Sequence, residues 1–442
     1  MAKSIFINKK INDFKKKINV SGDKSLSIRW ALLASQAIGK SRAYNLLKSE
    51  DIFSTLKCLK KLGVKIKFKN NICEIIGNGL NGFSFKKNLT LDAGNSGTLA
   101  RLILGLLIKS PFKIKLVGDP SLSKRDFSRI IIPLEKFGVN FYPKNRFKLP
   151  LYISGNDFLR PITYHEKKGS AQCKSSVMLA ALNTNGKTII KAKKSRDHTE
   201  ILFKYLKIPI KIKKRENHDL IEVHGKKNFK SFNYNIPSDI SSSAFFIVLT
   251  LLSKKSSLII KNVNINPSRT GLVSILNKMG AKIIFKNKKK YNGEKTADIF
   301  VKSAKKLNAI KCPTKYNSSA IDEFLIIFIV AAKAKGISYF KDLSELNQKE
   351  SPRLKIASKI LNMIGVKTKL TNHSIKIFGR PNLNLEKNYK IKNYLKDHRV
   401  FMMSTIAALT LGGNWKIYDP DSIKTSFPSF LKTIKKLGAK IN

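Results

Sequence analysis

Cysteine and long apolar segments are scarce in this sequence, and both shortages exclude classes of protein. The longest largely apolar stretches, Ala244–Leu252 and Phe324–Ala332, are far shorter than the roughly 20 residues that cross a bilayer. The first residues, MAKSIFINKKINDFKKK, lack the apolar run of a signal peptide. None of the four cysteines belongs to a CxxC pair, which argues against a disulfide framework or a metal cluster and favours a reducing compartment. We therefore expect a soluble, cytoplasmic protein that does not bind membranes. The cysteines are Cys58, Cys73, Cys173 and Cys312.

Acidic residues are also scarce, because 28 Asp and Glu stand against 86 Lys and Arg, with a formal net charge of +58. Such an excess is typical of nucleic-acid-binding proteins, and we keep a basic nucleic-acid-binding protein as an alternative from another class. However, 73 of the basic residues are lysines spread over the whole chain, without a basic tail or a groove of interleaved aromatic residues. Since Asn and Ile are also abundant, this distribution indicates a compositional bias on solvated surfaces. We expect weak polyanion binding at low salt and no specific nucleic-acid partner.

A short pattern of helix end, glycine and strand recurs along the chain. The first copy is LKKLGVKIKF around Gly63, and a degenerate copy, FKYLKIPIKI, has Lys207 where the glycine is expected. Glycine at this position indicates a left-handed helix cap, and the residues after it have the pattern of a short strand. Successive copies are 69 to 85 residues apart, which predicts one supersecondary unit repeated six times. The other copies surround Gly138, Gly280, Gly365 and Gly438.

Six such units of mixed helix and strand predict an α/β or α+β protein. One core of that size would be large, so we expect two groups of three units with a cleft between them. Crossovers between the groups are expected at residues 19–25 and 233–242, where Gly or Pro occurs with Ser, Asp and Asn.

Small polar residues and arginines gather at the expected starts of apolar helices. In LDAGNSGTLARLILGLL, residues 94–97 precede an apolar helix. Small residues let a ligand approach the backbone closely, and the free N–H groups of a helix start face an anion. Taken in isolation, residues 94–97 are explained equally well by a tight turn with a capping Ser or Asn. A capping box from Asp197 to Glu200 is the corresponding alternative for SRDHTE. Similar starts are GDKSLSIR, GDPSLSKR, GSAQ, SRDHTE, NPSRTG, IDEF, KESPR, DHR and TSFP.

The placement of arginine favours ligand binding over capping. Seven of the 13 arginines lie inside these segments, although the chain otherwise uses lysine. A guanidinium group holds carboxylate or phosphate through two parallel hydrogen bonds, which lysine does not form. We infer that helix starts from both halves of the chain bind a pair of ligands with several negative charges, and that the two halves close around them. The sequence has no GxxxxGKS/T, no GxGxxG after a strand and no metal-ligand spacing, so neither a nucleotide cofactor nor a metal is expected. The seven are Arg29, Arg101, Arg125, Arg196, Arg269, Arg353 and Arg399.

Taken together and in this order, the motifs resemble those of 5-enolpyruvylshikimate-3-phosphate synthases (3-phosphoshikimate 1-carboxyvinyltransferases), over about residues 19–438. GSAQ, SRDHTE and NPSRTG resemble the class II bacterial type. The resemblance implies two similar domains of three βαβαββ units each, an inverse α/β barrel, with residues 22–236 in the first domain and residues 1–21 and 237–442 in the second. The active site is expected in the cleft between them.

The resemblance also implies the reaction. The enolpyruvyl (carboxyvinyl) group of phosphoenolpyruvate is expected to be transferred to the 5-hydroxyl of shikimate 3-phosphate, with release of phosphate, through a tetrahedral intermediate. This is a step of the shikimate pathway to chorismate and aromatic amino acids. A monomer without metal or organic cofactor is expected.

Individual residues receive roles from the same resemblance. Asp322 is expected to take the proton from the 5-hydroxyl, and Glu350, with Lys24, to protonate the methylene carbon of phosphoenolpyruvate. Residues expected to bind shikimate 3-phosphate are Lys24, Ser25, Arg29, Ser170, Ala171, Gln172, Ser195, Arg196, Asp322 and Lys349. Residues expected to bind phosphoenolpyruvate are Lys24, Gly97, Arg125, Gln172, Arg353 and Arg399.

The sequence departs from the family pattern at a few positions. Pro352 stands where the family has Asp in KESDR, which leaves the register of Glu350 and Arg353 open, and Thr425 stands where some relatives have a lysine. Gly97 is the smaller of the two residues that the family uses there, and we expect glyphosate to enter beside it. The sister enzyme, UDP-N-acetylglucosamine enolpyruvyltransferase, remains an alternative; it is expected to have Lys-Asn where this chain has Lys-Ser, and a cysteine in a mobile loop.

Overall fold

The computed structural model describes residues 3–442, which divide into two compact units. Unit 1 holds the chain up to Ser21 together with Pro237–Lys289 and Lys295–Asn442, and unit 2 holds Gly22–Ile236 and Lys290–Glu294. The second segment of unit 2, Lys290–Glu294, is the tip of a hairpin, and we call it the hairpin tip. The domain boundaries expected from the sequence placed these residues in the second domain, with the rest of 237–442, whereas the structure places them in unit 2.

The recurring glycines end helices in both units. Gly63, Gly138, Gly280, Gly365 and Gly438 all have positive φ angles, from 77° to 109°. At Gly63 the requirement is also steric, because a Cβ would stand 2.3 Å from the carbonyl oxygen of Ser84. Lys207, in the degenerate copy, adopts the same left-handed conformation with φ of 56°. The repeat therefore reflects a recurring structural unit, and Lys207 adopts the cap conformation although it is not glycine.

Unit 2 contains three four-stranded sheets, each with one parallel strand pair followed by two antiparallel pairings. In spatial order the first is β14 (Asn233–Asn235), β3 (Ile38–Tyr44), β5 (Ile72–Asn78) and β4 (Lys65–Lys69). The second is β6 (Thr90–Asp92), β7 (Ile114–Val117), β9 (Leu151–Ser154) and β8 (Asn140–Tyr142). The third is β10 (Thr163–Glu166), β11 (Lys187–Lys193), β13 (His218–His224) and β12 (Ile210–Lys214).

Unit 1 also has three sheets among its described residues, one of four strands and two of three strands. The first is β16 (Ile283–Tyr291), β17 (Glu294–Lys302), β15 (Ser257–Asn264) and β2 (Lys15–Asn19). The second is β18 (Ile337–Phe340), β20 (Ile375–Phe378) and β19 (Thr368–Leu370), and the third is β1 (Ser4–Ile7), β22 (Gly412–Tyr418) and β21 (Leu385–Ile391). After the sixth cap, Asn442 closes the last sheet through two backbone hydrogen bonds to Phe6.

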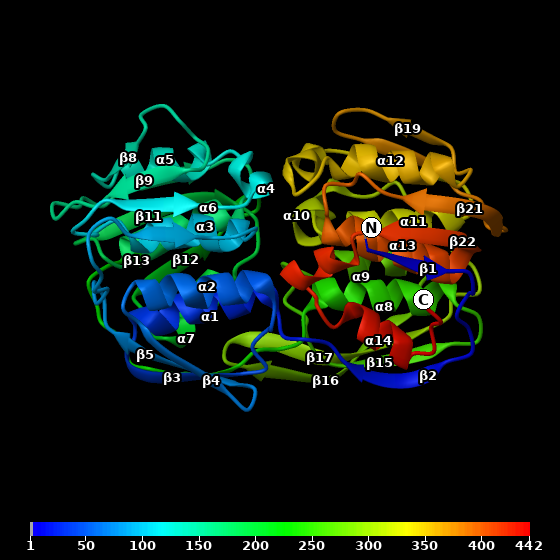
Figure 1. Ribbon diagram of the computed structural model, residues 1–442, viewed down its shortest axis with the longest axis horizontal. Helices are drawn as coiled ribbons and strands as arrows, with labels where there is room; N and C mark the ends of the chain where they lie inside the picture. Colours follow the sequence, from blue (N-terminus) through cyan, green and yellow to red (C-terminus); the bar gives the residue numbers. More distant parts are fainter. Residues whose placement is uncertain (1–2) are drawn as a thin grey trace. The chain divides into compact units, whose positions relative to one another are not determined.

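The core of each unit is built around three helices that are buried almost all round. They are α1 (Lys24–Gln36), α3 (Gly97–Leu106) and α6 (Ala171–Ala181) in unit 2, and α8 (Ile240–Leu252), α11 (Phe324–Lys333) and α13 (His398–Leu411) in unit 1. α8, α11 and α13 pack on one another, and α3 packs on both α1 and α6 (Figure 1). A helix that is apolar nearly all round has to be buried all round, and the charged side chains of these six helices lie in their first two turns or, at Lys333, at the last residue.

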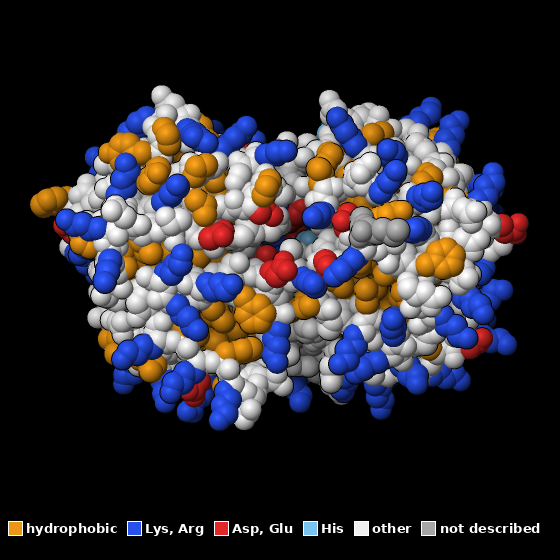
Figure 2. Space-filling view, in the orientation of Figure 1, with side chains coloured by type: hydrophobic (Ala, Val, Ile, Leu, Met, Phe, Trp, Pro, Cys, Tyr) orange, Lys and Arg blue, Asp and Glu red, His pale blue; other side chains and the backbone are white. Residues whose placement is uncertain are grey.

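The other helices are only partly buried. They are α2 (Glu50–Lys61), α4 (Pro120–Ser123), α5 (Ser128–Glu135), α7 (His198–Tyr205), α9 (Gly271–Lys278), α10 (Asn317–Ala320), α12 (Arg353–Met363) and α14 (Phe430–Lys436). Short 3-10 turns occupy Thr314–Tyr316, Ser344–Gln348 and Pro420–Thr425. Among the described residues, no helix combines the length and apolar character needed to cross a membrane. Lysine and arginine side chains are scattered over the visible face rather than gathered in one stripe (Figure 2).

Replacing Lys207 by glycine should stabilise the protein. A left-handed conformation costs a residue with a Cβ roughly 1–2 kcal/mol, and glycine avoids this cost but loses more entropy on folding. We expect Lys207→Gly to raise the free energy of unfolding by up to about 1 kcal/mol, measured by urea denaturation. Lys211→Gly, inside strand β12, is the control and should lower the free energy of unfolding. Equal effects of the two substitutions would contradict the role of Lys207 as a helix cap.

Candidate functional site at the buried helix starts

In unit 2 the three buried helices begin at the motif segments and are capped by their own side chains. Asp23 Oδ1 accepts a hydrogen bond from the Leu26 backbone at 2.9 Å and begins α1. Ser96 and Ser170 begin α3 and α6 in the same way. The capping interpretation of these segments is correct, and the remaining motif residues lie in or just after the first turns.

Gly97, Arg101, Arg125 and Gln172 form one cluster where α3 and α6 begin. Gln172 accepts from Arg101 Nη1 at 2.8 Å and donates to Thr98 Oγ1 at 2.9 Å. A Cβ on Gly97 would stand 2.8 Å from Arg125 Nη1 and 3.0 Å from Arg101 Nη1. Two guanidinium groups beside the N–H groups of a helix start make a site suited to a phosphate or carboxylate.

Lys24 and Arg29 lie on α1 and contact different neighbours. Lys24 Nζ lies 3.2 Å from Asp51 Oδ2, at the start of α2. Arg29 is almost fully buried and donates to Thr199 Oγ1, to Ser175 Oγ and to the backbone oxygen of the residue one turn before it, Ser25. Sequence reasoning did not single out Asp51, whose only signal was an acidic residue in the first turn of a helix.

Ser195 and Arg196 lie in the short loop before α7. The hydroxyl oxygen of Ser195 is buried without a hydrogen-bond partner among the described residues. The capping box considered for SRDHTE is not formed, because the side chain of Asp197 makes no capping hydrogen bond and Glu200 pairs with Lys174 instead. The motif is therefore not explained by helix capping.

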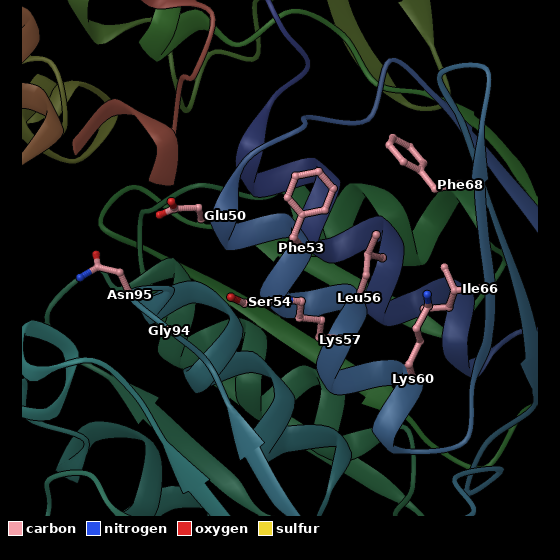
Figure 3. A pocket seen from close by; sticks show the side chains of 10 residues that line it. All are labelled: Glu50, Phe53, Ser54, Leu56, Lys57, Lys60, Ile66, Phe68, Gly94 and Asn95. Carbon is pink, nitrogen blue, oxygen red and sulfur yellow. The ribbon is translucent and has the colours of Figure 1, made fainter. Parts of the chain in front are cut away.

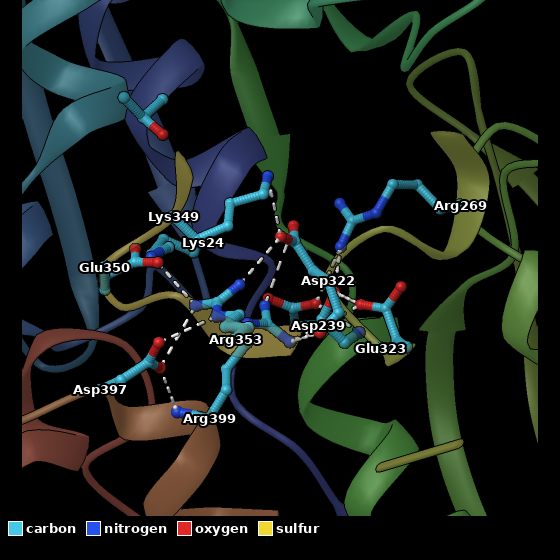
Figure 4. A network of polar contacts seen from close by, with 12 residues as sticks. Lys24, Asp239, Arg269, Asp322, Glu323, Lys349, Glu350, Arg353, Asp397 and Arg399 are labelled. Atoms are coloured by element: carbon cyan, nitrogen blue, oxygen red, sulfur yellow. Dashed lines mark hydrogen bonds and ion pairs between the residues drawn. The ribbon is translucent and has the colours of Figure 1, made fainter. Parts of the chain in front are cut away.

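In unit 1, three cations converge on Asp322, just before α11 (Figure 4). Its carboxylate lies 3.4 Å from Lys349 Nζ, 3.6 Å from Arg353 Nη1 and 4.0 Å from Arg399 Nη2. Arg399 also donates to the Asp322 backbone oxygen at 2.8 Å. The Asp322 side chain keeps 16% exposure, so it is fixed by cations yet open to a ligand.

Arg353 binds carboxylates on two sides. It forms a two-pronged pair with Asp397, at 2.9 and 3.2 Å, and a bond of 2.6 Å to Glu350. Pro352 lies at the N-cap position of α12, where a missing N–H costs nothing, so it does not bend the helix. The departure at Pro352 therefore leaves Glu350 and Arg353 in contact.

Asp397 is a buried anion that depends on Arg353. Burial by itself would raise the pKa of Asp397, but the charge and hydrogen bonds of Arg353 outweigh burial and hold this pKa below its usual value. Asp397 also accepts from Ser351 Oγ at 2.8 Å and caps α13 through the Arg399 backbone.

In unit 1 the cations of the candidate site are balanced by carboxylates. Lys349, Arg353 and Arg399 are accompanied by four carboxylates: those of Asp322, Glu323, Glu350 and Asp397. Buried cations require nearby anions, because an unpaired buried charge is strongly destabilising. Arg269 shows the same compensation, since it donates to Asp239 and Ser241, and Ser241 donates in turn to Glu323.

Two further features stand outside these clusters. Thr425 donates to a backbone oxygen within its own 3-10 turn, and Lys424 pairs with Asp421 at 2.9 Å. In unit 2 a cavity of about 570 Å³ lies between α2, β4 and the turn before α3 (Figure 3). None of the expected site residues lines it. The lining residues are Glu50, Phe53, Ser54, Leu56, Lys57, Lys60, Ile66, Phe68, Gly94 and Asn95.

Comparison with solved structures defines the class of fold. The enolpyruvyl transferase NikO from Streptomyces tendae superposes with a TM-score of 0.78 at 13% identity, over 100% of this chain and 99% of that one. The structure of EPSP synthase from Acinetobacter baumannii superposes with a TM-score of 0.87 at 33% identity, again over 100% and 99%. The expected mixed α/β architecture of repeated units is therefore confirmed as the enolpyruvyl transferase fold.

Sequence comparison defines the family within that class. The sequence model of the EPSP synthase (3-phosphoshikimate 1-carboxyvinyltransferase) family matches residues 8–434. The 3-phosphoshikimate 1-carboxyvinyltransferase of Ruthia magnifica is 40% identical over 445 residues, 99% of both chains, and that of Zymomonas mobilis is 36% identical over 438 residues, 98% of this chain and 96% of the relative. The chain belongs to the EPSP synthase family. It is a transferase of the shikimate pathway to aromatic amino acids, and it transfers the enolpyruvyl group of phosphoenolpyruvate to shikimate 3-phosphate.

Removing the charge of Asp397 should destabilise the protein in a pH-dependent way. The folded-state pKa of Asp397 is lowered, so its contribution is present above the unfolded value near pH 4 and is lost as pH falls through the folded value. We expect Asp397→Asn to cost about 3–5 kcal/mol at pH 7, as for a broken buried pair, and less at low pH, measured by urea unfolding. Asp421→Asn, in a half-exposed pair, is the control. An equal loss for Asp397→Asn at pH 3 and pH 7 would contradict this assignment.

Proposed function

We propose that the polar residues at the helix starts of unit 2 and those around Asp322 in unit 1 share the chemistry of the enolpyruvyl transfer. The observation that carries this proposal is the convergence of Lys349, Arg353 and Arg399 on the partly exposed carboxylate of Asp322. A carboxylate held in its ionised form by cations, yet open to a ligand, is suited to act as a general base. Asp322 then takes the proton of the substrate 5-hydroxyl as that oxygen attacks phosphoenolpyruvate.

Shikimate 3-phosphate binds to the polar helix starts of unit 2 in this proposal. The guanidinium of Arg29 has five N–H donors, so it can keep its protein contacts and bind a substrate oxygen as well. The unpartnered hydroxyl of Ser195 supports a ligand at the loop before α7. The residues assigned to this substrate are Lys24, Ser25, Arg29, Ser170, Ala171, Gln172, Ser195 and Arg196 from unit 2, with Asp322 and Lys349 from unit 1.

Phosphoenolpyruvate binds to guanidinium groups in both units. Arg125 beside Gly97, with Lys24 and Gln172, supplies the contacts from unit 2. Arg353 and Arg399 supply those from unit 1. Each substrate is thus assigned residues from both units, and closure of the units over the substrates would exclude water and strengthen every charged contact.

Proton delivery is assigned to Glu350 together with Lys24. Addition of the 5-hydroxyl to the double bond needs one group to remove a proton from oxygen and another to donate one to the methylene carbon. Asp322 fills the first role and Glu350 the second. The tetrahedral intermediate then loses phosphate as a proton leaves its methyl group, which re-forms the double bond, and the Glu350 carboxylate takes up that proton. Both carboxylates contact Arg353, at 3.6 and 2.6 Å, which supports their working in one site.

We also propose that the enzyme acts as a cytoplasmic monomer without a specific nucleic-acid partner. All four cysteines are free and buried, and burial raises the pKa of the Cys58 and Cys73 thiols to about 12. Such thiols are unreactive and suit a reducing compartment. The scattered surface lysines support weak polyanion binding only. Nucleic-acid affinity that persists above physiological salt would contradict this.

Substituting Lys24 or Asp322 should abolish turnover without unfolding the protein. In a phosphate-release assay with phosphoenolpyruvate and shikimate 3-phosphate, we expect Lys24→Met and Asp322→Ala each to lower kcat by about 10²–10⁴-fold, the usual contribution of a positioned acid or base. Matched controls are Lys57→Met on the exposed face of α2 and Asp421→Ala, which should retain activity. Near-normal turnover in either site variant would overturn the roles, and activity with UDP-N-acetylglucosamine alone would indicate the sister enzyme.

Enlarging Gly97 should weaken phosphoenolpyruvate binding. The added methyl of Gly97→Ala would stand 2.8 Å from Arg125 Nη1, so the guanidinium has to move. We expect KM for phosphoenolpyruvate to rise about tenfold, equivalent to about 1.4 kcal/mol, and inhibition by glyphosate to weaken in parallel. Lys124→Ala, on the residue next to Arg125, is the control. An unchanged KM would remove Gly97 from the site, and wild-type activity in excess glyphosate would refute its entry there.

A further inference from the structure

The first turn of α7 carries three consecutive polar side chains that are buried and that the proposed reaction does not use. His198, Thr199 and Glu200 are each at most 3% exposed. Each has a charged partner on a different segment of unit 2. Arg29 of α1 donates to Thr199 Oγ1 at 2.8 Å, and Lys174 Nζ of α6 lies 2.5 Å from Glu200 Oε1.

The partner of His198 comes from the hairpin tip. His198 Nδ1 lies 2.6 Å from Glu294 Oε1, and both side chains are at most 1% exposed. Beside this pair, Asn292 Nδ2 donates to a backbone oxygen of β14 at 3.1 Å. Gly293 packs so closely on α7 that a Cβ would stand 2.8 Å from Cγ2 of Ile201. The tip is thus docked on α7, although the strands that carry it, β16 and β17, belong to the sheet of β15 and β2.

These anchors fix the loop that precedes α7. The helix has only eight residues, and the side chain of its N-cap residue, Asp197, makes no capping hydrogen bond. The buried side chains of Leu202 and Phe203 hold the second half of the helix, and the contacts of the first turn position its start. Hydrogen-bonded charged groups in a buried setting tolerate little change in geometry, so the backbone just before His198 is held in one arrangement. That backbone carries Ser195 and Arg196.

We propose that His198 and Glu294 form a positioning pair for shikimate 3-phosphate. The pair holds the start of α7 against the hairpin tip and so keeps Ser195 and Arg196 in the arrangement that binds this substrate. Neither side chain of the pair touches the substrate. The inference rests on the proposed role of Ser195 and Arg196 in binding shikimate 3-phosphate.

The test compares disruptive and conservative variants of both partners. His198→Ala and Glu294→Ala remove the contact, whereas His198→Asn retains a donor near Nδ1 and Glu294→Gln retains an acceptor oxygen. We expect the alanine variants to raise KM for shikimate 3-phosphate about tenfold, equivalent to about 1.4 kcal/mol, with KM for phosphoenolpyruvate and kcat little changed. The conservative variants should recover most of the affinity.

A variant that touches neither partner keeps the test independent of buried-charge effects. Gly293→Val adds a side chain against Ile201 and should push the tip away from α7. It should raise the same KM as the alanine variants do. His218→Ala, on β13 of the same unit, is the control and should leave all constants unchanged.

Direct binding of shikimate 3-phosphate, measured by calorimetry, tests the binding role of Ser195 and Arg196 separately from the positioning role of His198 and Glu294. If the wild-type protein does not bind it, the assigned binding site fails. If the wild type binds it and all folded variants bind equally well, only the positioning pair is refuted. A fall in thermal stability without any change in KM would give the pair a purely structural role and would also refute the inference.

Discussion

Burial of six helices on every side is the constraint on which the rest of this structure depends. A helix packed all round has little lateral surface for charged groups, but its first four N–H groups still require partners. Caps and most charged side chains of these helices therefore lie in the first two turns, and the caps include Asp23, Ser96 and Asp397. The threefold repeat in each unit then brings several starts together. One packing rule thus produces both the core and the candidate site.

Two populations of cations follow from this arrangement. Exposed lysines are hydrated and lose little by substitution, so the composition can drift toward lysine on the surface. Buried cations need carboxylates in fixed geometry, and Arg353 forms a two-pronged pair with Asp397 that a lysine could not reproduce. This explains why arginine is concentrated at the helix starts of a lysine-rich chain, and why carboxylates accompany it there.

The sequence allowed prediction of what is local and repeated. Glycine caps recur at similar intervals, and the repeat located Lys207 at the cap position, where the structure shows the left-handed conformation. The family motifs located the helix starts. Contacts between distant segments were not predictable: Asp51 with Lys24, Glu200 with Lys174, and Glu294 with His198 have no spacing signal, because tertiary packing alone brings them together. The charge balance around Asp322 was missed for the same reason.

The pairing of Arg353 suggests how the proposed base can change charge without disturbing its surroundings. Cations around Asp322 favour its ionised form, which a general base requires before it accepts a proton. Anionic substrate groups at Arg353 and Arg399 would compete with Asp322 for these cations, so neutralising Asp322 would cost less once both substrates are bound. Meanwhile the fully buried pair with Asp397 keeps Arg353 in place whatever the state of Asp322. Fixed and exchangeable partners on one guanidinium therefore separate the structural role of Arg353 from its proposed role in the reaction.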